Sequence, residues 1–110
     1  MPRAFAAGTP ILVYLHSPRE KVFGVLVSLD PAGVALRGIE LSTFEDWLRQ
    51  EARGGDGLGP VTVFYPMNRV ERVEKDETLG ALEGLAARFR RETGRTVAEA
   101  AGLSTRRKRR

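Results

Sequence analysis

Few residues in this sequence have the types and spacing that catalysis or metal binding needs. His16 is the only histidine and cysteine is absent, so neither a metal site built from these residues nor thiolate chemistry is predicted. Ser17 and Ser28 have no partnered base in the pattern, so nucleophilic catalysis has no support. Capping of a turn explains Asp30 fully. We therefore predict a protein that is not an enzyme and has no cofactor, with His16 as a turn residue.

The residues best suited to contact nucleic acid lie at the end of the chain. Five consecutive basic residues stand there: Arg106, Arg107, Lys108, Arg109 and Arg110. The whole chain has 18 basic and 14 acidic residues, so without these five it has 13 basic residues and a net charge of −1. Such a tail can bind nucleic acid, anionic lipid or an acidic partner. The alternative is a solvated, disordered end over residues 104–110.

Length and composition predict one small domain. The chain has 110 residues, of which 42% are hydrophobic and 29% charged, which is ordinary for a soluble globular protein. We place the domain at residues 9–103. The amino-terminal apolar stretch is too short for a signal peptide and no later run could span a bilayer, so we expect a cytoplasmic protein without a membrane partner.

Five segments have the β-branched, apolar character of strands, at about residues 11–15, 20–29, 34–41, 61–65 and 69–74. Gly24 lies inside the second, where glycine marks a bend or a close backbone approach. Asp30 to Gly33 form a tight reversal, in which Asp30 accepts backbone hydrogen bonds and Gly33 permits positive φ. Val70 and Val73 are out of phase, which indicates a bulge or the strand's end. The Pro-containing break before them would allow a hairpin between the last two strands.

Helical patterns follow the third and the fifth predicted strand. The first begins at Ser42, which with Glu45 has the spacing of a capping box, and runs to Arg53. The second begins at Thr78 as N-cap and ends at Gly94. Its apolar stripe consists of Leu79, Leu82, Leu85, Ala86 and Phe89. A second capping box, from residue 96 to 99, opens a short helical turn that residue 102 ends.

The order of these elements resembles the Sm-like proteins, the family that includes bacterial Hfq. Gly24 followed six residues later by Asp30 is similar to the family's signature in strand two, and residues 61–73 resemble its second motif. The phrases FEDWLRQEA and FYPMNRVER also resemble a group of short bacterial proteins of unassigned function. The resemblance covers about residues 11–73. It implies a mainly β fold: a five-stranded, bent antiparallel barrel with a helix inserted between strands three and four and a helix after strand five.

The resemblance also implies a function. Sm-like subunits form rings in which strand four of one copy pairs with strand five of the next, and they bind RNA. The uncharged segment 61–65 is a poor choice for an exposed edge, which agrees with pairing between copies. The turn 31–33 has no residue to stack on or read a base, so Asn68 and Arg69 are the nearest candidates to contact a base edge and a phosphate. The alternative is an interaction or scaffold module that does not bind nucleic acid.

Overall fold

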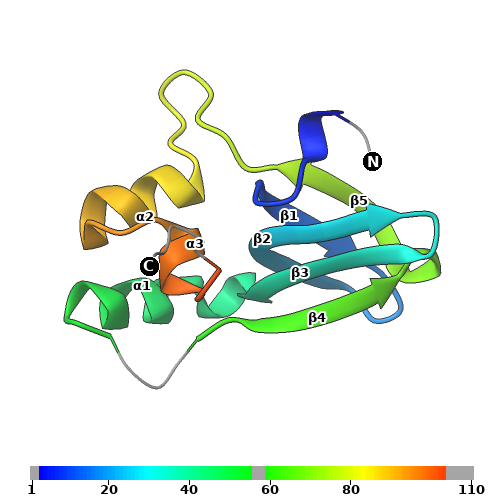
Figure 1. Cartoon of the computed structure of the whole chain (residues 1–110), viewed down its shortest axis with the longest axis horizontal. Helices are drawn as coiled ribbons and strands as arrows, with labels where there is room; N and C mark the ends of the chain where they lie inside the picture. Colours follow the sequence, from blue (N-terminus) through cyan, green and yellow to red (C-terminus); the bar gives the residue numbers. More distant parts are fainter. Residues whose placement is uncertain (1–2, 56–58, 104–110) are drawn as a thin grey trace, which may run out of the picture.

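A computed structural model of the chain describes residues 3–55 and 59–103. It contains a five-stranded antiparallel sheet in the order β4-β3-β2-β1-β5 (Figure 1). The strands are β1 (Pro10–Leu15), β2 (Glu20–Asp30), β3 (Gly33–Glu40), β4 (Val61–Pro66) and β5 (Val70–Lys75). The α-helices are α1 (Phe44–Ala52), α2 (Leu85–Thr93) and α3 (Val97–Ala100), and three short 3-10 turns are η1 (Arg3–Phe5), η2 (Leu41–Thr43) and η3 (Met67–Arg69). All five predicted strands and the helix between β3 and β4 are confirmed.

Two β-bulges bend the sheet. In β2 the register against β3 shifts between Leu26 and Ser28, which leaves Val27 without a partner. In β5 the register against β1 shifts so that Arg72 pairs with Tyr14 and Val70 with the next residue of β1. The bulge that the out-of-phase valines predicted is therefore confirmed. A bulge bends its strand and increases the local twist, so both strands curve.

The sheet is strongly curved but it is not a closed barrel. β4 and β5 are the two edges of the sheet and do not pair with each other, so the predicted hairpin between them is wrong. Only η3 joins Pro66 to Val70, and four steps of chain span at most roughly 14 Å. Four strand spacings in a flat sheet would measure roughly 19 Å. The sheet must therefore curl to bring its two edges within reach of this link.

The curved sheet has a hydrophobic cluster on each face. The first is formed by strand residues alone, namely Ile11, Val13, Leu15, Val22, Leu26, Val34 and Leu36. The second joins Phe23 and Val25 of β2 to the helices. Its helical members are Phe44, Trp47 and Leu48 of α1, Phe89 of α2 and Val97 of α3. The Trp47 and Phe89 rings are stacked with their centroids 4.5 Å apart, so the aromatic side chains hold the two longer helices together against the sheet.

The start of α1 differs from the sequence prediction. Residues 41–43 form η2, and α1 begins at Phe44 with Thr43 as N-cap and no side-chain capping bond. The Thr43 hydroxyl instead donates to the Glu40 carbonyl, 2.7 Å away. The predicted capping box between Ser42 and Glu45 is therefore wrong. Glu45 is used elsewhere, because its carboxylate faces α2.

α2 begins later than predicted, at Leu85 rather than directly after Thr78. Gly80 has φ +61°, which the helix cannot accommodate, and it forms a tight turn between Leu79 and Leu82. We call residues 77–83 the leucine arm, since they project beyond α2 and away from the sheet (Figure 1). The second capping box is confirmed: Thr96 accepts from the Glu99 amide, and the Glu99 side chain accepts from the Thr96 amide.

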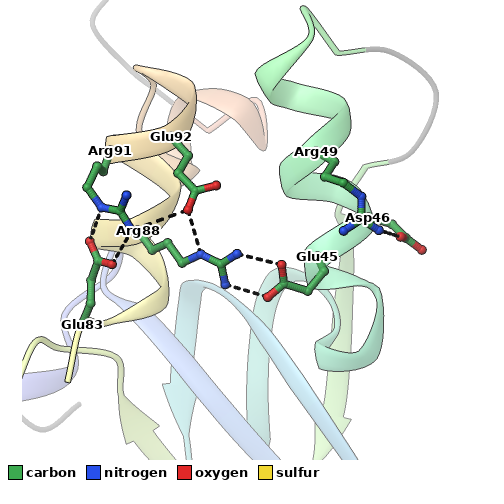
Figure 2. A network of polar contacts seen from close by, with 7 residues as sticks. All are labelled: Glu45, Asp46, Arg49, Glu83, Arg88, Arg91 and Glu92. Carbon is green, nitrogen blue, oxygen red and sulfur yellow. Dashed lines mark hydrogen bonds and ion pairs between the residues drawn. The ribbon is translucent and has the colours of Figure 1, made fainter.

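Ion pairs link the exposed sides of α1 and α2 (Figure 2). Arg88 of α2 donates to both carboxylate oxygens of Glu45, at 2.6 and 2.8 Å, and to Glu92 one turn further on. Arg91 makes a similar two-bond contact with Glu83, at the end of the leucine arm. The hydrogen bonds from Arg88 lower the pKa of Glu45, and those from Arg91 lower the pKa of Glu83. These carboxylates therefore stay charged to a lower pH than free glutamate does.

Candidate functional site

β4 is an edge strand of the sheet, and it is the most exposed of the apolar strands in the described fold. Among the described strands β4 pairs only with β3, so its other side presents unpaired backbone groups. Its sequence, VTVFYP, has no charge, and the side chains of Val61 and Phe64 are 62% and 53% exposed. Natural edge strands are usually short, charged or covered, because an open apolar edge pairs readily with another chain. β4 lacks the charge, and no described element covers it, so it is a candidate surface for β-strand pairing.

The edge formed by β5 has the opposite character. β5 pairs only with β1 in the described sheet, and its sequence VERVEK contains four charged residues in six positions. Arg72 donates to Glu74 at 2.8 Å and lies over the Tyr14 ring, 4.1 Å from its centroid. Charge on an edge suppresses indiscriminate pairing. The fold thus presents one apolar edge and one charged edge, which are two different surfaces for a strand partner.

Glycines allow the strands beside these edges to approach closely. Gly24 lies opposite Gly38, and a Cβ on Gly24 would lie 2.3 Å from the carbonyl oxygen of Arg37. A Cβ on Gly33 would lie 2.2 Å from the Tyr65 carbonyl oxygen and 2.7 Å from the Phe64 ring. The φ of Gly33 is not positive, so this residue is needed for space rather than for its backbone conformation. At the same turn, Asp30 Oδ1 accepts from the Ala32 amide at 2.8 Å.

Arg69 is engaged by the fold. Its Nε donates to the His16 carbonyl at 3.1 Å and its Nη2 to the Pro18 carbonyl at 2.7 Å, while Glu20 lies 3.9 Å away. The His16 amide in turn donates to the Arg69 carbonyl. Asn68 is exposed on η3 beside it. Arg69 therefore ties η3 to the turn between β1 and β2 and its side chain is 26% exposed, whereas Asn68 is on the surface.

A basic and aromatic cluster on β1, β2 and β5 was missed by the sequence reasoning. Lys21 and Arg72 are the direct cross-strand neighbours of Tyr14, and both cations lie over its ring. The Tyr14 hydroxyl donates to Glu74 at 3.2 Å. Residues 14, 21 and 72 are far apart in the sequence, and only the strand register brings them together. No signal in the sequence marks this cluster, because it depends on the pairing order β2-β1-β5.

The basic residues at positions 106–110 lie outside the described residues. The described chain ends at Leu103, just after α3, and Arg37 of β3 contacts this end. Its Nε donates to the Ala101 carbonyl at 2.7 Å and its Nη1 to the Thr62 hydroxyl at 3.2 Å. Thr62 is in β4. Arg37 therefore bridges the end of α3 to the apolar edge.

The residues that the structure describes contain neither a metal-binding cluster nor a membrane-spanning helix. No group of three or more His, Asp and Glu side chains lies close enough there to hold a metal ion. The helices in residues 3–55 and 59–103 are too short or too polar to cross a bilayer. His16 lies in the turn after β1, with its Nδ1 3.2 Å from the Ser17 hydroxyl.

Comparisons with protein-family models, with curated proteins and with solved structures found no match to this chain.

Proposed function

We propose that this chain is a non-enzymatic, cytoplasmic protein of Sm-like type that assembles with copies of itself through the edges of its sheet and binds RNA. The observation that carries the proposal is the free, uncharged edge of β4, with Val61 and Phe64 exposed. In the Sm-like arrangement, strand four pairs with strand five of a neighbour, and here β4 and β5 are the two free edges.

Pairing between different edges is head-to-tail. Such a contact closes as a ring when the rotation between copies is suitable, and otherwise continues as a filament. Pairing with β5 would satisfy backbone groups on both edges and would cover the apolar side chains of β4.

RNA binding is proposed from the distribution of basic groups. The tail at 106–110 supplies five positive charges, and a ring would gather several tails. Lys21 of β2, which lies over the Tyr14 ring and makes no ion pair in the described part of the chain, adds one further cation for a phosphate.

Light scattering of the purified protein, with its ratio of absorbance at 260 and 280 nm, tests both parts. We expect a mass that is a multiple of 12.1 kDa and a spectrum that shows nucleic acid. Val61→Lys should lower the mass, because a charge on the strand opposes edge pairing. Val27→Lys is the matched control, since Val27 is 40% exposed but lies on a bulge inside the sheet. A monomer for the unaltered chain would contradict edge assembly.

A scaffold that assembles without RNA is the second candidate. The observation that favours it is the engagement of Arg69 by the His16 and Pro18 carbonyls, because these bonds use two of the N–H donors that a phosphate would need. In that case the purified oligomer would carry no nucleic acid, and its mass would not change on nuclease treatment. The same preparation therefore separates the two candidates.

A further inference from the structure

The leucine arm is a built hairpin rather than a loose connection. Leu79 and Leu82 exchange both backbone hydrogen bonds, at 2.9 and 3.0 Å, across the two residues Gly80 and Ala81. Positive φ at the first central residue, as Gly80 has, is typical of the type II′ turn that joins paired strands. The two leucines are directly opposite each other, so their side chains emerge on the same side of the turn.

The base of the arm is held by hydrogen bonds that direct it away from the body. The Asp76 carboxylate accepts from the amides of Leu85 and Ala86, at 2.8 and 2.9 Å, at the start of α2. The Asp76 amide donates to the Pro10 carbonyl, and the Thr78 hydroxyl accepts from the Gly84 amide. The arm therefore has a fixed root, and its tip projects away from the sheet (Figure 1).

The tip leaves two large apolar side chains in solvent. Leu79 is 62% exposed and Leu82 is 74% exposed, the latter being the most exposed large hydrophobic side chain in the described part of the chain. Two adjacent leucines on a preformed turn lose little conformational freedom when they are buried. A feature of this kind is suited to enter an apolar hollow.

Such a hollow, of about 280 Å³, lies between the start of β1, helix α2 and helix α3. We call it the alanine groove. It is lined mainly by small apolar residues, including Gly8, Pro10, Ala86, Ala87, Val97 and Ala98. The arm does not occupy this groove within its own chain, because its leucines are exposed.

The charges at the two surfaces are complementary. Arg90 lines the alanine groove, and its guanidinium has no ion-pair partner among the described residues. The arm is flanked by Glu77 and Glu83, of which Glu83 is already bound to Arg91. Glu77 is exposed and has no partner in the described chain. An arm that enters the groove can therefore bring an unpaired carboxylate to an unpaired guanidinium.

We infer that the leucine arm of one copy docks into the alanine groove of a second copy, with Glu77 facing Arg90. The arm leads directly into α2, whose Ala86 and Ala87 line the groove, so arm and groove flank the same helix. Two copies can therefore exchange arms reciprocally about a twofold axis. The exchange uses no residue of β4 or β5 and is independent of edge pairing.

Crosslinking between two single-cysteine variants tests this contact directly, since the chain has no cysteine. Ala81→Cys, at the tip of the arm between the two leucines, is mixed with Ala87→Cys and treated with a short bismaleimide, which bonds to two thiols. Both sites are exposed, so the variants should fold. We expect linked dimers to form at least about tenfold faster than in a mixture with Ala52→Cys, because docking raises the local thiol concentration. Ala52 is an exposed residue at the end of α1, away from the groove.

Equal crosslinking to positions 87 and 52 would overturn the inference. Charge exchange supplies a second readout: Glu77→Arg and Arg90→Glu should each slow crosslinking, and their combination should restore it. With Val61→Lys present, the crosslink should persist even where the edge assembly is lost, so the two contacts fail separately.

Discussion

Gly24 of β2 and Gly38 of β3 are direct cross-strand partners, and at both positions the backbone of the neighbouring strand leaves no room for a side chain. A Cβ on Gly24 would lie 2.6 Å from the Gly38 Cα, and one on Gly38 would lie 2.6 Å from the Phe23 carbonyl oxygen. The atoms in the way belong to the backbone, so they cannot be displaced by a change of rotamer. This contact places two strands unusually close at the middle of the curved sheet.

Replacing Gly24 with alanine should destabilise the fold. The added methyl group would collide with the Arg37 carbonyl oxygen, and overpacking of this kind costs about 1–3 kcal/mol. Urea denaturation followed by tryptophan fluorescence measures the change in the free energy of unfolding. Gly59→Ala is the matched control, because nothing lies within 4 Å of a Cβ there. An unchanged midpoint for Gly24→Ala would contradict the close approach.

Arg69→Met should loosen the turn between β1 and β2. It removes two hydrogen bonds from a charged donor to the His16 and Pro18 carbonyls, and we expect a loss of about 1–3 kcal/mol. Asn68→Ala, at the neighbouring exposed position, should change the stability by less than about 0.5 kcal/mol. Thermal unfolding of both variants measures the difference. A loss of RNA affinity in Arg69→Met without a loss of stability would instead indicate a phosphate contact.

The ion pair between Arg88 and Glu45 should make part of the stability depend on pH. Because the pKa of Glu45 is lower in the folded state than its ordinary value of 4.5, the pair stabilises the fold above that value. The contribution is lost as the pH falls below 4.5 and through the folded-state pKa. Glu45→Gln should therefore be less stable than the unaltered chain at neutral pH, and denaturation at a series of pH values should show the difference shrinking in acid.

High salt provides the control for that prediction. Both side chains are exposed to solvent in part, so about 1 M sodium chloride should screen the pair and reduce the difference at neutral pH. A difference that stays constant with both pH and salt would mean that Glu45→Gln alters the stability through packing rather than charge.

Removing residues 104–110 should weaken any RNA binding and make it less dependent on salt. The five basic residues lost can each release counterions from phosphates, so the slope of log affinity against log salt should fall by up to roughly 3.5. The effect should be similar for RNAs of different sequence, since phosphate contacts carry no sequence information. Unchanged affinity would direct attention to Lys21, Arg72 and Asn68.

Local patterns predicted the strands well because the β-branched, apolar runs are separated by turn residues. Asp30 and Gly33 marked the reversal between β2 and β3, and the phase shift between Val70 and Val73 marked a bulge. The pairing of β4 with β3 rather than β5 was not accessible in the same way. Pro66 and Asn68 are compatible both with a hairpin and with a 3-10 turn, and only the curvature of the whole sheet decides between them.

The leucine arm shows why a helical stripe can mislead. Leu79, Leu82, Leu85 and Phe89 have suitable spacing for one helix face, yet Gly80 adopts positive φ and the first two leucines face solvent. Asp76, rather than Thr78, provides the capping oxygens for α2. The cluster around Tyr14 was also inaccessible, because Lys21 and Arg72 reach it only through the strand register.

The short link η3 makes the two ends of the sheet unequal. At the end where Pro66 and Val70 lie, the three residues of η3 join the two edges directly, and Arg69 binds η3 to the turn between β1 and β2. At the other end, Asp76, the residue after β5, is bound to the start of α2, and Thr62 of β4 is bound through Arg37 to the Ala101 carbonyl after α3. The two edges are therefore tethered to each other at one end of the sheet and to two different helices at the other.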